Sequence, residues 1–476
     1  MAETILQQIT RERQQSVTQT LALLPSGALE QPLPLSNRSL FAALNQPAAG
    51  FILECKKASP SKGVLASNFH ASRLAQHYQP YAAAISVLTE PDYFQGCFEY
   101  LRAVASSVPQ PVLCKDFIST LAHVRLARYF GADAILLMLS VLEDDEYQQL
   151  AAAAAELQLD VLTEVSTEAE TNRAVALGAK IIGINNRNLH DLSIDPNRSK
   201  QLSKLIPSDR LVIAESGYSH HAAVRDAALI ANGFLVGSAL SGAKDVSLAC
   251  RGLIYGQHKV CGLTRAEDAE VAAASGAYYG GLIFAQRSPR CISLAQAQAI
   301  TQHEPNLAYV AVVVEQTVAD IVELAKALPL TAVQLHGSQA GAFRAELRVA
   351  LDKIGVTTAI WQALSVTPTL SLATLSTFEH ADKIVLDNGQ GGSGETFDWR
   401  QLSAVEPEQR SRLLLAGGLR SDNLDDAIRI ALNQGFHGFD FNSGVEFQPG
   451  VKNAQQVQQV FHQLRQYGRK IGPEAV

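Results

Sequence analysis

The sequence predicts an α/β protein made of two consecutive (β/α)8 TIM barrels, with an extra N-terminal helix before the first. Three observations favour this architecture. The chain has 476 residues, too many for one ordinary domain. Short runs rich in Val, Ile and Leu alternate with Ala-rich helical stretches, as in parallel sheets whose strands are joined by helices. About eight such runs occur in each half, and each half has the usual length of one barrel.

The composition narrows the class of protein. Apolar residues make up 47% and charged residues 18% of the chain, which is typical of a globular protein. The net charge of −7 and the lack of a basic run disfavour nucleic acid and membrane partners. The six cysteines are scattered without a C-x-x-C spacing, so we expect neither a metal site nor a disulfide framework. The polar N-terminus and the absence of a long apolar run predict a cytoplasmic protein.

The expected elements follow in chain order. The first forty-odd residues read as an amphipathic helix and a Pro-rich connector. The strands expected in the first barrel are 50–57, 82–89, 111–117, 132–139, 159–165, 179–186, 210–216 and 233–240. Those expected in the second are 258–263, 278–284, 307–315, 330–337, 358–364, 382–388, 412–418 and 438–444.

The predicted domains are residues 1–256 and 257–476, with almost no linker between them. The alternative is an open doubly wound sheet. We favour barrels because eight strands recur twice, and because no G-x-G-x-x-G follows the first strand of either half.

Polar side chains end strand after strand in the first half, where a barrel keeps its active site. They are Glu54 and Lys56, then Lys115, Glu164, Asn185 and Arg187, and Glu215. Side chains alternate along a strand, so Glu54 and Lys56 should both point inward, while Cys55 should pack outward against a helix. A buried charge is costly unless it is paired or catalytic. A solvated rim would explain any one of these residues, but explains their repetition poorly.

Small residues stand at the ends of the last two strands of the first half. Strand seven ends in Glu215, Ser216 and Gly217, and strand eight ends in Gly237 and Ser238. The loops after these strands are the usual phosphate site of a barrel. Turns also need such residues, so the signal depends on their position.

The segments ECKKASPSKG, CKDF, LTEV, INNR, AESG and VGSAL together resemble indole-3-glycerol phosphate synthase over residues 1–256. The resemblance implies a substrate made of anthranilate carrying an open-chain deoxyribulose phosphate. It also implies closure of a pyrrole ring with loss of carbon dioxide and water.

The same resemblance implies roles for the predicted site residues. Lys115 is expected to be the general acid, with a pKa lowered by a second cation in a dry mouth, and Glu164 the general base. Lys56 is expected to neutralise the phosphate or carboxylate and could share acid duty. The remaining residues hold or tune these groups (Glu54, Asn185, Glu215), lie near the anthranilate carboxylate (Ser59) or cradle the phosphate (Gly217, Gly237, Ser238).

The second half offers a thiol and a carboxyl group at strand ends. Cys261 ends its first strand in KVCGLTR, and Asp387 ends its sixth in VLDNG. A Gly-rich loop follows over 389–399, and AGG (416–418) and NSG (442–444) repeat the phosphate arrangement of the first half. One base and one acid without a cofactor suit proton transfer between adjacent carbons. Alternatively, Cys261 is a small core residue, and Asp387 caps the loop that follows it.

The segments KVCGLTR, GGLIF with SPR, VQLHG, VLDNG, GGSGETFDW, LAGGL and DFNSGVE with GVK resemble phosphoribosylanthranilate isomerase over about residues 257–476. The resemblance implies an Amadori rearrangement. Asp387 would protonate the furanose ring oxygen, and Cys261 would remove the C2′ proton. The residues expected to bind the substrate are Arg290 at the anthranilate carboxylate, Gly418, Ser443 and Gly444 at the phosphate, and Gln334 and His336 in the mouth. His336 could equally be structural.

The isomerase product is the synthase substrate, so the whole chain resembles the bifunctional bacterial enzymes of tryptophan biosynthesis. The resemblance implies phosphorylated anthranilates as small-molecule partners and no cofactor. We expect a monomer, because the fusion already supplies a second barrel. Two alternatives stay open: a pair of phosphosugar barrels of other specificity, and a non-catalytic scaffold in which one barrel has decayed.

Overall fold

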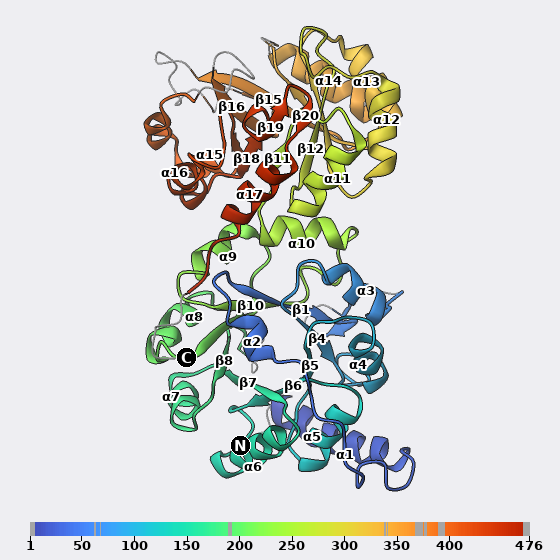
Figure 1. The fold of residues 1–476 in the computed structure, drawn as a ribbon, viewed down its shortest axis with the longest axis vertical. Helices are drawn as coiled ribbons and strands as arrows, with labels where there is room; N and C mark the ends of the chain where they lie inside the picture. Colours follow the sequence, from blue (N-terminus) through green and yellow to red (C-terminus); the bar gives the residue numbers. More distant parts are fainter. Residues whose placement is uncertain are drawn as a thin grey trace. The chain divides into compact units, whose positions relative to one another are not determined.

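The computed structural model describes residues 5–60, 63–66, 68–188, 193–337, 339, 341–366, 375, 378–388 and 396–469. The chain divides into two compact units, Met1–Cys250 with Gln466–Val476, and Arg251–Arg465 (Figure 1). The division falls inside helix α10 (Val246–Ile254), a few residues before position 256.

The C-terminal segment groups with the first unit by hydrogen bonding. The backbone N–H of Arg469 donates to Ala231 O at 2.9 Å, and Asn232 Nδ2 donates to Arg469 O at 2.8 Å. Ala49 N also donates to Tyr467 O at 2.6 Å. The first unit is therefore built from two separated stretches of the chain.

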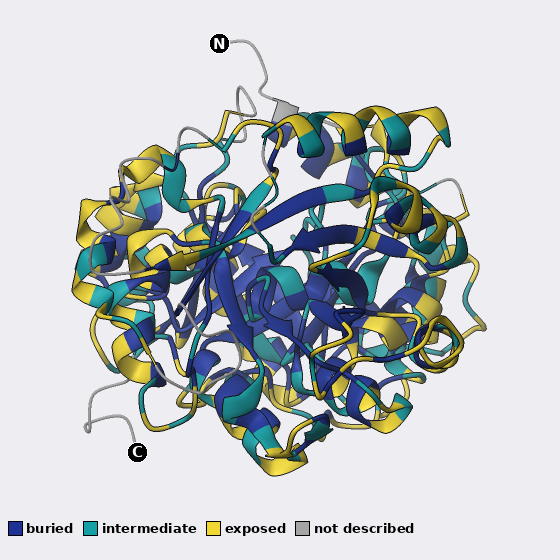
Figure 2. Ribbon diagram, turned by 90° about the horizontal axis from the view of Figure 1, so that it is seen from above, coloured by how far each residue is buried: buried dark blue, intermediate teal, exposed yellow. Residues whose placement is uncertain are grey.

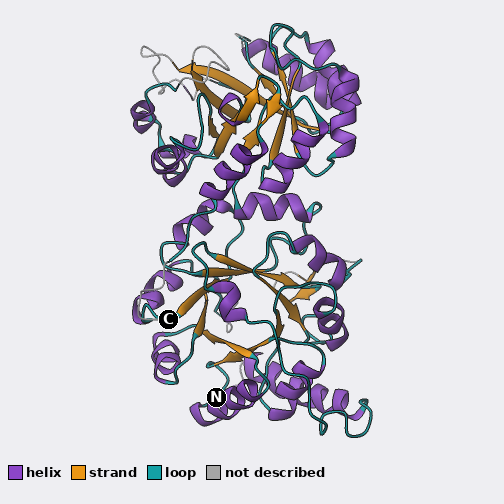
Figure 3. Ribbon diagram, viewed as in Figure 1, coloured by secondary structure: helices purple, strands orange, loops and turns teal. Residues whose placement is uncertain are grey.

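Eight parallel strands close the first barrel, and each lies within a run that the sequence predicted (Figure 3). The strands are β1 (Gly50–Cys55), β4 (Ala84–Leu88), β5 (Val112–Lys115), β6 (Ala134–Met138), β7 (Asp160–Val165), β8 (Ile181–Asn185), β9 (Leu211–Glu215) and β10 (Gly233–Val236). The barrel closes where β1 pairs with β10, with Gly50 opposite Gly233. This closure excludes the open doubly wound sheet. A two-stranded antiparallel hairpin, β2 (Ala58–Ser59) and β3 (Gly63–Val64), follows β1.

The helices of the first unit surround this barrel. They are α3 (Ala71–Tyr78), α4 (Phe98–Ala105), α5 (Leu121–Tyr129), α6 (Asp144–Glu156), α7 (Glu168–Ala176), α8 (Asn197–Leu202), the 3-10 turn η1 (Ser203–Leu205) and α9 (His221–Ala227). Side-chain caps fix where some of them begin, because the hydroxyls of Thr120 and Thr167 accept from the first turns of α5 and α7.

The predicted N-terminal helix is α1 (Ile5–Ala22), and a short helix α2 (Leu40–Leu44) precedes β1. A buried ion pair fastens α1 to the barrel. Arg13 Nη2 lies 2.6 Å from Asp116 Oδ2 and donates to Thr89 O at 3.1 Å. Asp116 directly follows Lys115, so α1 is locked beside the ends of β4 and β5.

The second barrel is also closed by eight parallel strands, seven within the predicted runs and the fifth ending two residues beyond its run. They are β11 (Lys259–Val260), β12 (Tyr279–Ile283), β13 (Ala308–Val313), β14 (Leu330–Leu335), β15 (Ala359–Val366), β16 (Lys383–Asn388), β17 (Leu413–Leu415) and β18 (Gly438–Phe441), followed by the hairpin β19 (Glu446–Gln448) and β20 (Val451–Lys452). Its helices are α11 (Ala266–Ser275), α12 (Leu294–His303), α13 (Val318–Ala327), α14 (Gly341–Lys353), η3 (Trp399–Ala404), α15 (Pro407–Arg410), α16 (Leu424–Ile430), η4 (Leu432–Gln434), η5 (Ser443–Val445) and α17 (Ala454–Leu464).

Side chains alternate along each strand. Those that point outward form an apolar core with the helices, and those that point inward include the polar residues of the barrel interior. In the second unit, outward side chains such as Val333 and Ile384 pack with helix residues such as Leu347 in one apolar cluster. The strands are buried while the helices expose their outer faces (Figure 2). Within the described part of the chain, no helix is both long and apolar enough to span a membrane.

Candidate active sites

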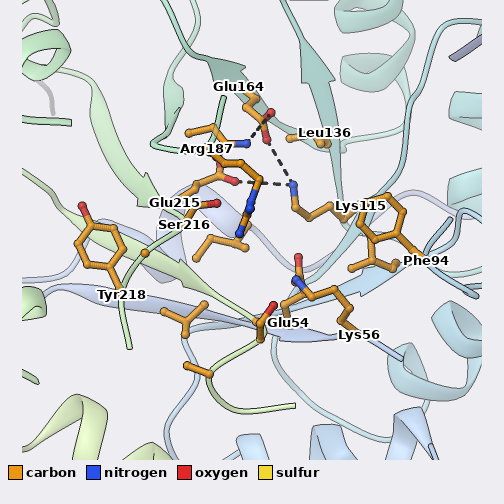
Figure 4. Close-up of a pocket in the computed structure, with 18 of the residues that line it drawn as sticks. Glu54, Lys56, Phe94, Lys115, Leu136, Glu164, Arg187, Glu215, Ser216 and Tyr218 are labelled. Carbon is orange, nitrogen blue, oxygen red and sulfur yellow. Dashed lines mark hydrogen bonds and ion pairs between the residues drawn. The ribbon is translucent and has the colours of Figure 1, made fainter. Parts of the chain in front are cut away.

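A cavity of about 360 Å³ opens where the strands of the first barrel end (Figure 4). Most predicted site residues of this half line it: Glu54, Lys56, Lys115, Glu164, Asn185, Arg187, Glu215, Ser216, Gly217, Gly237 and Ser238. The convergence arises because parallel strands all end at one face of a barrel. Ser59 is not among the lining residues. It lies buried in β2, and its hydroxyl has no hydrogen-bond partner in the described part of the chain.

Lys115 is the centre of a polar network that joins four strands (Figure 4). Its Nζ lies 3.3 Å from Glu164 Oε2 and 3.6 Å from Glu215 Oε2. Asn185 Nδ2 donates to the other oxygen of Glu164 at 3.2 Å. One lysine therefore contacts two carboxylates inside the mouth.

The expected lowering of the Lys115 pKa is wrong. Burial alone would lower this pKa, but the charges of Glu164, Glu215 and Glu54 outweigh burial and raise it above the usual range of a lysine. The second cation has little influence because Lys56 is paired with Glu54. The sequence showed both lysines, but it did not show that more carboxylates than cations would surround Lys115.

Glu215 is almost fully buried below the mouth. Burial raises its pKa well above the usual range of a carboxyl group, and Lys115 only partly opposes this effect. A Cβ at Gly183 in β8 would collide with Glu215 Oε1, so a glycine is needed for this carboxyl group to fit.

Glu54 and Lys56 both point into the mouth and form an ion pair, as the alternation in β1 predicted. A Cβ at Gly237 would collide with Glu54 Oε1 and lie 2.9 Å from Lys56 Nζ. The glycine after β10 is thus required by this pair, a reason separate from the predicted phosphate contact. Cys55 points the other way, and its buried thiol contacts Ala71 O of α3 at 3.7 Å, which confirms its core role.

The loop after β9 has an unusual backbone. Ser216 and Gly217 have φ angles of +64° and +93°. A serine in this left-handed region is uncommon, and such strain often marks functional sites. Asn186 Nδ2 supports the loop by donating to Ser216 O at 3.2 Å.

Sequence reasoning missed the apolar wall of this cavity. Its members are Leu88, Phe94, Phe117, Leu136, Met138, Ile194, Leu235 and Val236. Leu136 and Met138 stand two residues apart in β6, so their shared inward face could have been read from the alternation. A cavity lined by apolar side chains and several charged groups suits an aromatic ligand that carries anionic groups.

The second mouth holds the two predicted proton-transfer groups. Cys261 follows β11 and is 5% exposed, and burial raises the pKa of its thiol. Asp387 lies near the end of β16, where burial first and the charge of Asp440 second raise its pKa to about 6. His336 Nε2 lies 3.9 Å from Asp387 Oδ2, and burial lowers the pKa of this histidine.

Lys259 and Asp440 are polar groups of this barrel that sequence reasoning missed. Lys259 Nζ lies 2.7 Å from Asp440 Oδ2 and 2.8 Å from Gln334 Oε1, and the lysine is fully buried. A lysine two residues before Cys261 shares its inward face, which was the available signal.

Arg290 is engaged within the protein. Its Nε and Nη2 donate to both oxygens of Glu446, at 2.7 to 3.0 Å. Lys452 Nζ binds the same carboxylate at 2.8 Å and Asn442 Oδ1 at 3.1 Å. Two cations therefore flank Glu446 beside the predicted phosphate loop.

The predicted phosphate residues of this half lie on two loops in close contact. Ser443 and Gly444 belong to η5, and a Cβ at Gly444 would collide with Leu419 O in the loop after β17. Gly418 in that loop has a φ of +64°. Of the predicted Gly-rich loop, residues 389–395 lie outside the described residues.

Two family models match the chain. Indole-3-glycerol phosphate synthase matches residues 6–253, and N-(5'phosphoribosyl)anthranilate (PRA) isomerase matches residues 258–463.

Curated relatives match along the whole chain. The tryptophan biosynthesis protein TrpCF of Salmonella typhi is 47% identical over 465 residues, covering 98% of this chain and 100% of that protein. The TrpCF protein of Vibrio cholerae is 46% identical, over 97% and 96%. Among solved structures, phosphoribosyl anthranilate isomerase from Thermus thermophilus is 28% identical with a TM-score of 0.38, covering 44% of this chain and 98% of that one.

Proposed function

The chain belongs to the family of TrpCF tryptophan biosynthesis proteins, and on this premise we propose which residues carry each of its two reactions. The first barrel is an indole-3-glycerol phosphate synthase, a carboxy-lyase, and the second is a phosphoribosylanthranilate isomerase. The enzyme acts on phosphorylated anthranilate derivatives. We place the two domains at residues 1–256 and 257–476.

In the first barrel, Lys115 is the general acid and Glu164 the general base. The observation that carries this proposal is the contact of Lys115 Nζ with Glu164 and Glu215 in a cavity with one apolar wall. The raised pKa of Lys115 keeps its amine protonated, so its charge stabilises the oxygen that becomes anionic as the ring carbon attacks the ketone, and its proton is transferred to that more basic oxygen. Glu164 then accepts the ring proton that is lost on dehydration. The apolar wall receives the anthranilate ring.

The anionic groups of this substrate are bound by cations and loops of the first mouth. Lys56, with Ser59 nearby, faces the carboxylate or the phosphate, and the loops at Ser216, Gly217, Gly237 and Ser238 receive the phosphate. Arg187 adds a cation to the same wall. Glu54, Asn185 and Glu215 position these groups.

In the second barrel, Asp387 is the acid and Cys261 the base. Asp387 with a pKa of about 6 is partly protonated near neutral pH, which suits donation to the furanose oxygen. Cys261 then removes the C2′ proton. Arg290 binds the anthranilate carboxylate from its place beside Glu446, and Gly418, Ser443 and Gly444 bind the phosphate. Gln334 and His336 complete the mouth.

Turnover of each substrate by Lys115→Ala and Asp387→Ala tests both assignments. We expect Lys115→Ala to lose ring closure and Asp387→Ala to lose isomerisation, each by about 1000-fold, with the other activity unchanged as an internal control. Unchanged turnover in both variants would favour the scaffold alternative. We further propose a monomeric, cytoplasmic enzyme. Light scattering of the purified chain tests its monomeric state, and cell fractionation tests its location.

A further inference from the structure

The interior of the second barrel holds a lysine whose contacts point to a role in the chemistry. We propose that Lys259, balanced by Asp440, is a positioning residue that stabilises the thiolate form of Cys261. The inference rests on the proposed function of Cys261 as the base, and it names the group that lets a buried thiol ionise.

Every N–H of the Lys259 ammonium group has an acceptor. Nζ lies 2.7 Å from Asp440 Oδ2, 2.8 Å from Gln334 Oε1 and 3.2 Å from Cys261 Sγ. An ammonium group has three N–H donors, so these contacts use all of them and fix its orientation. One of the three points at the sulfur that must lose a proton.

The barrel is shaped to receive this pair of side chains. A Cβ at Gly281 in β12 would lie 2.7 Å from Cys261 Sγ and 2.9 Å from Lys259 Cε. Such distances are too short for real carbon contacts, so only glycine leaves room here. An ordinary core would not need a glycine in the middle of a buried strand.

The charges around the sulfur oppose the cost of burial. Burial raises the pKa of Cys261 and sets the net upward direction, Lys259 opposes this most strongly, Asp440 raises the pKa and Lys452 adds a smaller lowering. The other charged or titratable groups of this mouth, in the described part of the chain, are Arg290, Glu446, His336 and Asp387. Burial alone would also lower the pKa of Lys259, but Asp440 and Cys261 raise it, so the lysine stays charged.

This arrangement explains why Asp440 accompanies the lysine. A lysine without a counter-charge would hold the thiolate so strongly that it became a weak base. The carboxylate offsets part of the lysine's charge and so limits its effect on sulfur, while the thiolate itself also keeps Lys259 protonated. During the reaction Cys261 accepts the C2′ proton and becomes a neutral thiol, and Lys259 keeps all its protons.

The proposal predicts opposite effects from two variants. Asp440→Asn leaves the lysine and removes its counter-charge, so the pH midpoint of Cys261 ionisation should fall by about one unit. Lys259→Met with Asp440→Asn removes both charges, so the midpoint should rise by about one unit. Lys326→Met is the matched control, because it removes an exposed lysine of α13 in the same unit and should leave the midpoint unchanged.

The readout is the pH profile of iodoacetamide alkylation at Cys261, followed by mass spectrometry of its peptide because the chain has six cysteines. Folding is checked by tryptophan fluorescence on heating, since both tryptophans of the chain, Trp361 and Trp399, belong to the second unit. Midpoints that stay within about 0.3 units of the parent in both folded variants would overturn the proposal.

A variant of Cys261 separates this inference from the proposed function. If Cys261→Ala keeps its isomerase activity, the role of Cys261 as base is wrong, whereas the alkylation profiles still measure whether Lys259 acts on the sulfur. If both proposals hold, the isomerase pH profile of Asp440→Asn shifts with its alkylation midpoint, while ring closure in the same preparation does not change.

Discussion

The two barrels use the carboxyl end of their first strand in the same way for different chemistry. In β1, Glu54 and Lys56 stand two residues apart and pair in the mouth; at β11, Lys259 and Cys261 do the same. In each barrel a glycine on a neighbouring strand or loop leaves the space, Gly237 in one and Gly281 in the other. The i, i+2 geometry of a barrel strand thus accommodates either an ion pair or a lysine–thiol pair.

The barrels differ in where their charges lie. In the first, Lys115 and its carboxylates line an open cavity, so substrate can reach the lysine. In the second, Lys259 is fully buried, and Cys261 stands between it and the mouth. Lys115 reaches the cavity and suits proton transfer to the substrate. Lys259 is buried and suits an indirect role, through its contact with Cys261.

Among the variants that test this comparison, we expect Cys261→Ser to have the largest effect on activity. A hydroxyl ionises far less readily than a thiol, so isomerisation should fall by about 1000-fold or more, measured with phosphoribosylanthranilate. Ring closure by the same sample should be unchanged. A loss of both activities would mean that the substitution unfolds the chain rather than removing a base.

Asp387→Asn should stabilise the second unit while stopping isomerisation. The folded-state pKa of Asp387, about 6, lies above its unfolded value near 4, so the carboxyl group favours folding below pH 4 and loses that contribution as the pH rises through 6. A neutral amide avoids this loss. The free energy of unfolding at pH 7 should rise by about 2 to 3 kcal/mol, as measured by tryptophan fluorescence in denaturant.

In the same titration, the gain of Asp387→Asn should vanish at pH 4, where the native carboxyl group is already protonated. A gain that persisted at pH 4 would show that its origin is not the buried charge.

We expect the smallest effect from two glycine variants, which test the glycine that leaves space for a side-chain pair in each barrel. Gly281→Ala should lower isomerase kcat by about 10-fold, and Gly237→Ala should lower synthase kcat by a similar factor, because each Cβ displaces the side-chain pair beside it. Steady-state kinetics with both substrates measures each effect. If either variant lowered the activity of the other barrel by the same factor, the effect of the substitution would not be confined to its own barrel.

The strands and most of the first mouth were predictable because both follow from local periodicity. Apolar runs located all sixteen strands, and barrel closure then brought their C-terminal residues together. The apolar wall was less visible, because Phe94 and Phe117 lie in loops without a period. The anchor between Arg13 and Asp116 joins residues 103 positions apart, which no local pattern can report.

The sequence by itself determined the two barrels, their order along the chain and which residues end their strands, because alternation and helix periodicity act over short distances. Only the tertiary structure determined the electrostatics. In the folded chain three carboxylates raise the pKa of Lys115, Arg290 pairs with Glu446, and Lys259 contacts Cys261. Charges act through space and through burial, and both depend on which distant strands the closed barrels bring together.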